Sequence, residues 1–131
     1  MSKAAKAYSN NQVETDISEA DPIKLILLVY DKIFENLRLG KLEINENKHG
    51  IEYFTKASDL INSGLLIALD LNKGGKIAED LDLIYRWALR KIILARIEKS
   101  TDMIDEIISV LAPLHEAWLI ISSEQRKPAV V

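Results

Sequence analysis

Two residues near the middle of the chain have a spacing that can bind metal ions. Glu46 and His49 form a Glu-x-x-His pair, which carboxylate-bridged di-metal bundles use to place two ligands on one face of a helix. Such a site needs a second copy of the motif and two further inward-facing glutamates, and the segment around His115 does not repeat it. Because Gly50 follows directly, we interpret Glu46 and His49 as part of a solvated turn.

A second short segment, KGGK at residues 73–76, resembles a phosphate-binding loop. A true phosphate loop follows a strand and ends in Gly-Lys-Ser/Thr, whereas this segment follows an expected helix and lacks that ending. Paired glycines favour a turn because they adopt positive φ without steric cost. We therefore predict a loop at residues 71–75 that leads into a helix.

The remaining reactive side chains suggest no catalysis. The 131 residues include no cysteine and two histidines, which excludes thiolate nucleophiles and cysteine-bound metals. Asp31, Asp70 and Asp105 stand alone in the sequence, with no predictable partner for acid–base chemistry. We predict that the protein is not an enzyme, has no catalytic residues, and needs no cofactor or metal.

Charge and hydropathy exclude two further classes of function. The chain has 17 basic and 20 acidic residues, a net charge of −3, and no basic block of the kind that nucleic-acid binding requires. Its longest apolar run covers residues 25–30, whereas a membrane-spanning helix needs about 20 residues. We expect a cytosolic protein that neither binds nucleic acid nor inserts into membranes.

Apolar residues recur with a helical period over four long segments. The expected helices cover 22–46, 51–70, 77–98 and a segment that starts at 100–102 and runs to about 121. Short connections make neighbouring helices antiparallel, so the fold class is all-α, an up-down four-helix bundle. Asp21 and Pro22 provide a strong start for the first helix, as N-cap and first helical residue.

The chain is expected to form a single domain, 1–131, with less regular ends. Residues 1–20 are polar and are expected to form a mobile arm, 21–122 the bundle, and 123–131 a frayed tail. Pro113 lies inside the last helical pattern and should kink or break the helix, because it lacks a backbone donor. A short extra helix at the N-terminus or after Pro113 is compatible with this pattern.

The helices are more apolar than a four-helix core requires. In the first helix, Leu27, Tyr30 and Phe34 lie beside the main apolar stripe. In the third helix, the residues roughly opposite the main stripe are Leu83, Trp87 and Leu94. Surplus apolar surface on a soluble chain often marks a binding site for another chain. The alternative is a core wide enough to absorb these residues.

Several short motifs follow one another in an order that resembles the flagellar export chaperones that hold flagellin. The resemblance runs from about residue 8 to residue 120, nearly the whole chain. Its motifs are Tyr8, Val13, Thr15, Pro22, Leu25, Val29-Tyr30-Asp31, Leu69-Asp70, Gly74-Gly75-Lys76-Ile77-Ala78, Leu81, Ile84-Tyr85, Ile92, Ala95 and Glu116-Ala117-Trp118.

The resemblance implies an export chaperone of the bacterial cytosol. Members of that family bind the C-terminal segment of flagellin, which is disordered in the free monomer, prevent its premature polymerisation and keep it competent for flagellar type III secretion. The implied partners are flagellin, the flagellar export gate and a co-chaperone. Without its client, the chain is expected to be a monomer or a weak homodimer.

Combining the resemblance with the surplus apolar residues gives a predicted partner-binding set. Its members are Tyr8, Leu27, Tyr30, Phe34, Leu83 and Trp87, with Tyr8 as the anchor of the arm. Tyr85 and Trp118 are expected to stabilise the bundle instead. Three alternatives stay open: a helical adaptor for a different amphipathic partner, a bundle that binds a ligand or metal, and a helix-turn-helix DNA-binding protein.

Overall fold

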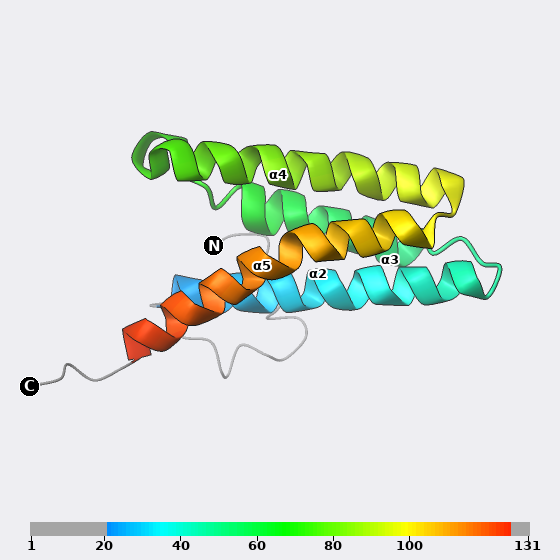
Figure 1. Cartoon of the computed structure of the whole chain (residues 1–131), viewed down its shortest axis with the longest axis horizontal. Helices are drawn as coiled ribbons and strands as arrows, with labels where there is room; N and C mark the ends of the chain where they lie inside the picture. The colour runs from blue at the N-terminus through cyan, green and yellow to red at the C-terminus, as the bar shows by residue number, and fades with distance from the viewer. Residues whose placement is uncertain (1–20, 127–131) are drawn as a thin grey trace, which may run out of the picture.

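The computed structural model describes residues 21–126, and every regular element among them is helical. The elements are α2 (Pro22–Asn45), α3 (Ile51–Leu60), the π-helix η2 (Ile61–Leu66), α4 (Leu71–Glu98) and α5 (Thr101–Arg126). Helix α3 continues directly into η2, so the chain makes four antiparallel rods (Figure 1). The prediction of an all-α four-helix bundle is confirmed, while the expected arm and the last residues of the tail lie outside the described residues.

Helix α2 begins where the sequence predicts. The side chain of Asp21 accepts a hydrogen bond from the backbone N–H of Lys24 at 3.0 Å, and Pro22 occupies the first turn. The helix ends at Asn45, one residue before the predicted end, and the chain reverses through Asn47, whose φ is 61°.

Glu46 and His49, whose spacing resembles half of a di-metal site, lie in the turn between α2 and α3. His49 Nδ1 accepts a hydrogen bond from the backbone N–H of Ile51 at 3.1 Å, so the ring helps to start α3. Gly50 follows with φ of 65°, a conformation that strongly favours glycine. Among residues 21–126, no three His, Asp or Glu side chains gather as metal ligands.

Two glycines let α3 approach α2 closely. A Cβ atom on Gly40 would lie 2.6 Å from Cζ of Phe54, and one on Gly50 would lie 2.8 Å from Cε2 of the same ring. The ring of Phe54 therefore fits into space that only glycine leaves free, and it is almost fully buried. This contact fixes the α2–α3 pair at one end of the bundle.

Helix α4 begins earlier than predicted, which corrects the expected loop at residues 71–75. The carboxylate of Asp70 accepts hydrogen bonds from the backbone N–H groups of Asn72 and Lys73 at 3.1 and 3.0 Å, so it caps a helical turn. Gly75 then breaks the regular geometry, with φ of 55° and ψ of −136°. The glycine pair thus makes a kink within a helix, where the sequence suggested an open loop.

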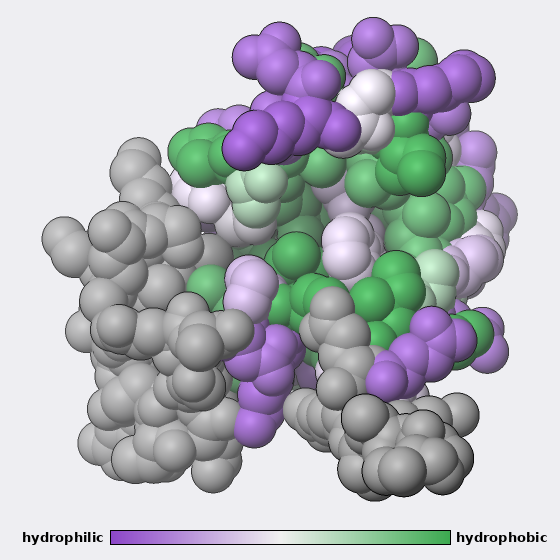
Figure 2. Space-filling model, turned by 90° about the vertical axis from the view of Figure 1, so that its left-hand side faces the viewer, coloured by the Kyte–Doolittle hydropathy of each residue, from purple (hydrophilic) through white to green (hydrophobic). Residues whose placement is uncertain are grey.

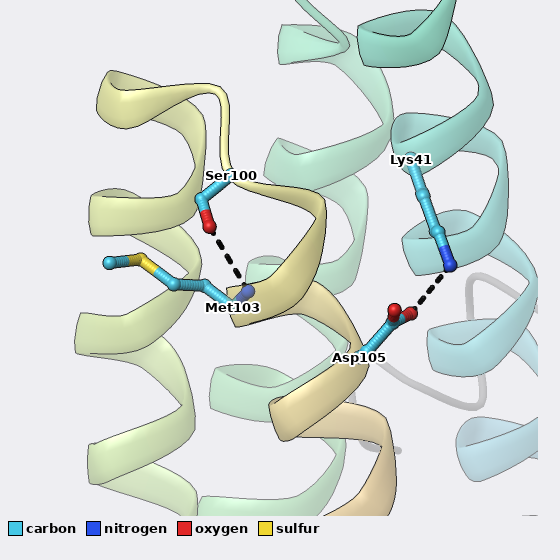
Figure 3. Close-up of polar contacts among 4 residues, drawn as sticks. All are labelled: Lys41, Ser100, Met103 and Asp105. Atoms are coloured by element: carbon cyan, nitrogen blue, oxygen red, sulfur yellow. Dashed lines mark hydrogen bonds and ion pairs between the residues drawn. The ribbon is translucent and has the colours of Figure 1, made fainter.

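The α4–α5 turn lies at the same end of the bundle as the α2–α3 turn (Figure 1). Lys99 has a positive φ of 51°, and Ser100 Oγ accepts a hydrogen bond from the backbone N–H of Met103 at 3.2 Å (Figure 3). Nearby, Lys41 Nζ of α2 forms an ion pair with Asp105 Oδ1 of α5 at 2.7 Å. The start of α5 is therefore capped by Ser100 and tied to α2 by Asp105.

Helix α5 continues through Pro113 instead of breaking there. Pro113 and Ser109, the residue whose carbonyl loses its helical donor, both lie on the exposed side, where water can replace the missing bond. The second half of α5 turns away from α4 and crosses the start of α2 (Figure 1). The helix extends past Ser122, into the part expected to be frayed.

The core lies between all four rods. Helix α2 packs against both α3 and α5, and α4 packs against α3, η2 and α5. The largest fully buried aliphatic side chains are Val29, Ile33, Leu37, Ile61, Ile92, Ile104, Ile107 and Leu111. Within residues 21–126, no helix has the length and apolar character to cross a membrane.

Candidate functional site

Three of the predicted partner-binding residues face the interior. Tyr30 is 0% exposed, and Leu27 and Phe34 are also buried. The expectation that these residues form a free apolar stripe on α2 is therefore not met, because the second half of α5 covers that side of α2. Tyr8 lies outside the described residues.

Tyr30 belongs to a buried aromatic cluster where α2, α4 and α5 meet. Its hydroxyl lies 2.5 Å from the hydroxyl of Tyr85, and the two rings pack edge to face. The ring of His115 lies 5.6 Å from that of Tyr30 and 5.5 Å from that of Phe34. The cluster joins three helices through contacts that combine packing with a hydrogen bond.

Burial controls the ionisation of the two phenols. It raises the pKa of Tyr30, and the neighbouring Tyr85 raises it further, while Trp118 acts in the opposite direction. Burial also raises the pKa of Tyr85, although its hydrogen bond to Tyr30 and the influence of Trp118 lower it. Both hydroxyls therefore remain protonated at neutral pH and form a structural pair.

His115 also makes a polar contact with Asp31 at the edge of this cluster. Its Nε2 lies 3.1 Å from Oδ1 of Asp31, which joins the second half of α5 to α2. Asp31 is exposed, so water screens this contact. Aromatic packing is thus the main contribution of His115, and the arrangement contains no nucleophile poised beside a base.

The other two predicted residues lie on the outside of α4. Leu83 is 66% exposed and Trp87 is partly exposed, whereas Tyr85 between them faces the core. They form one row with residues that follow at intervals of three and four positions along the helix. We call this row the α4 stripe, and its members are Leu83, Trp87, Arg90, Leu94 and Ile97.

A groove between α3 and α4 adjoins the α4 stripe. It has a volume of about 320 Å³, with Phe54 and Ile92 among its apolar lining and Asp59 and Arg96 among its polar lining. The complete lining consists of Phe54, Thr55, Ser58, Asp59, Leu89, Ile92, Ile93 and Arg96. Ile93 is half exposed and lies between the groove and Ile97 around the helix, so groove and stripe form one continuous apolar surface.

Sequence reasoning missed most of this surface. Leu94 was recognisable as surplus on the third helix, but Arg90 and Ile97 were not singled out. The intervals of four, three, four and three residues from 83 to 97 were the available signal. The groove could not be found in this way, because it depends on the separation of α3 and α4.

Apolar residues are also exposed at the end of the bundle where α4 begins. Ile67, Leu71 and Ile77 are each at least half exposed on the segments that meet there. Figure 2 looks onto this end and shows apolar side chains gathered between polar margins. Like the α4 stripe, this surface is suited to contact with another chain.

Comparison with known proteins gives a consistent result. A family model described as "Flagellar protein FliS" matches residues 4–125. The flagellar secretion chaperone FliS of Campylobacter jejuni is 35% identical over 116 residues, covering 88% of each chain. The protein of the same name from Salmonella typhimurium is 31% identical over 119 residues, covering 89% of this chain and 88% of its own. The Bacillus subtilis protein of that name is 24% identical over 123 residues, covering 92% of this chain and 87% of its own.

Proposed function

Because the chain belongs to the FliS family of flagellar secretion chaperones, we propose that it binds the C-terminal segment of flagellin in the bacterial cytosol. Binding would prevent premature polymerisation and keep flagellin competent for export. The observation that carries this proposal is the continuous apolar surface formed by the α3–α4 groove and the α4 stripe. Leu83 and Trp87 would contact the client directly.

The chemistry of the surface suits a flexible client. A disordered amphipathic segment that lies along exposed apolar side chains buries surface on both partners, and the groove adds polar side chains to fix its path. Ordering the segment costs free energy, so affinity is lower than the buried area suggests. A complex of this kind can be tight enough to protect the client and still release it at the export gate.

The buried members of the predicted partner-binding set have a structural role in this proposal. Leu27, Tyr30 and Phe34 would act from inside the bundle, by holding the helices that carry the surface. Substitutions there should therefore change stability first and client binding only as a consequence. Substitutions on the α4 stripe should do the reverse.

A seeded polymerisation assay tests the proposed function. We expect an equimolar amount of this protein to suppress elongation of host flagellin from filament seeds, followed by light scattering, because the bound C-terminal segment is unavailable for assembly. A matched control is the variant that carries both Leu83→Asp and Leu94→Asp, since both side chains are exposed and the fold should persist. Undiminished elongation with the folded wild-type protein would contradict the proposal.

A further inference from the structure

Two residues one helical turn apart weaken the backbone of α5 near its middle. Pro113 has no N–H to donate to the carbonyl of Ser109, so one bond of the helical ladder is missing. The hydroxyl of Ser109 donates to the carbonyl of Glu106 at 2.8 Å, a local contact that tends to bend helices. Figure 1 shows the second half of α5 turning away from α4. The two halves of α5 can therefore move relative to each other with little further loss of backbone hydrogen bonds.

The first half of α5, residues 101–112, is anchored on both sides. Lys41 of α2 pairs with Asp105 at 2.7 Å, and Lys91 of α4 pairs with Glu106 at 3.2 Å. Its side chains that are 0% exposed are Ile104, Ile107 and Leu111. Detaching this half would open the centre of the core, so we expect it to stay packed until the whole fold opens.

The second half of α5, residues 114–126, is held less firmly. Trp118 is only partly buried, and Leu119 and Ile120 are 47% and 54% exposed. The polar contact that ties His115 to α2 is exposed on the side of its partner and is screened by water. This half should therefore detach at a lower cost in free energy than the first half.

The second half of α5 covers an aromatic face of α2. The ring of His115 lies 5.6 Å from that of Tyr30 and 5.5 Å from that of Phe34, and both of these rings are buried. Movement of His115 away from α2 would therefore expose the two rings to water together.

We infer that residues 114–126 form a hinged cover, which detaches from α2 as a unit about Pro113 while residues 101–112 stay packed. In the closed state the cover conceals Tyr30 and Phe34, and in the open state both become accessible. The opening is a property of the free chain and needs no client, so this inference goes beyond the proposed function.

Hydrogen exchange of the full-length chain, followed by mass spectrometry, tests the hinge. After correction for intrinsic rates, we expect the amides of residues 114–121 to exchange at least about tenfold faster than those of residues 105–112. Pro113→Ala restores a donor for Ser109 and should slow exchange in 114–121 by more than about fivefold, because detachment then has to break a continuous helix. Lys91→Ala, which removes an ion pair of the first half, is the matched control and should leave exchange in 114–121 unchanged.

A thiol probe separates detachment of the cover from fraying of its last turns. The chain has no cysteine, so Phe34→Cys places a single thiol beneath His115. We expect this thiol to react with a maleimide in the folded chain, and we expect Pro113→Ala in the same background to slow the reaction by more than about fivefold. Fraying from the C-terminal end leaves His115 in place and the thiol protected.

Two results would overturn the inference. Equal protection along the whole of α5 would show that this helix opens only when the fold opens. A gradual loss of protection toward the end of the helix that Pro113→Ala does not change would assign the exchange to fraying. Neither measurement involves flagellin, so the failure of the hinge and the failure of the proposed function are distinguishable.

Discussion

Replacing Tyr30 with alanine is expected to lower the free energy of unfolding by about 3–5 kcal/mol. The side chain is 0% exposed, and it contacts Phe34, Tyr85 and His115, so truncation leaves a cavity where three helices meet. A domain of this size is stable by only about 5–15 kcal/mol. Urea denaturation followed by circular dichroism measures the change.

The hydroxyl pair supplies the control for this substitution. Tyr30→Phe and Tyr85→Phe each leave one buried hydroxyl without its partner 2.5 Å away, which costs about 1–3 kcal/mol. The double variant removes both hydroxyls and should cost less than the sum of the two single changes. Strict additivity would show that the two hydroxyls do not stabilise the fold as a pair.

Raising the pH above about 10 is expected to lower the free energy of unfolding. The decrease should be steeper than in a chain that lacks the buried Tyr30–Tyr85 pair. Burial raises the pKa of both tyrosines, so the native state keeps phenolic protons that the unfolded chain releases above its ordinary pKa of about 10. The unfolded state then binds fewer protons than the native state, and stability falls as pH rises. Each tyrosine contributes a slope of at most about 1.4 kcal/mol per pH unit, which develops as the pH rises through about 10 and ends at the folded-state pKa of that tyrosine.

The pH dependence is measured by urea midpoints between pH 8 and pH 11. The double variant with Tyr30→Phe and Tyr85→Phe lacks both phenols and retains the other titrating groups, so its decline should be shallower. Equal slopes for this variant and the wild-type chain would contradict the proposed origin of the effect.

The ends of the helices could be predicted where the determinants are local. Asp21 and Pro22 define the start of α2 through one capping side chain and one fixed φ angle. The start of α4 was missed because the carboxylate of Asp70 captures two backbone donors and extends the helix ahead of the glycine pair. The π-helical geometry at Ile61–Leu66 has no comparable local signal in the sequence.

The proposed partner surface was only partly predictable, for a reason that concerns tertiary structure. The apolar positions of a single helix show how wide its apolar face is, but not how many neighbours cover that face. Helix α2 is covered on two sides, by α3 and α5, so Tyr30 and Phe34 are buried. Among residues 21–126, no helix covers the outer face of α4 in this way, and Leu83 remains exposed.

Calorimetric titration of this protein with host flagellin, intact and without its C-terminal segment, tests the chaperone function most directly. We expect one-to-one binding of intact flagellin and none of the truncated form, because the client segment supplies the residues that cover the groove and the α4 stripe. Equal binding of both forms would place the contact elsewhere on flagellin. Binding of neither form by the folded chain would contradict its assignment as a flagellin chaperone.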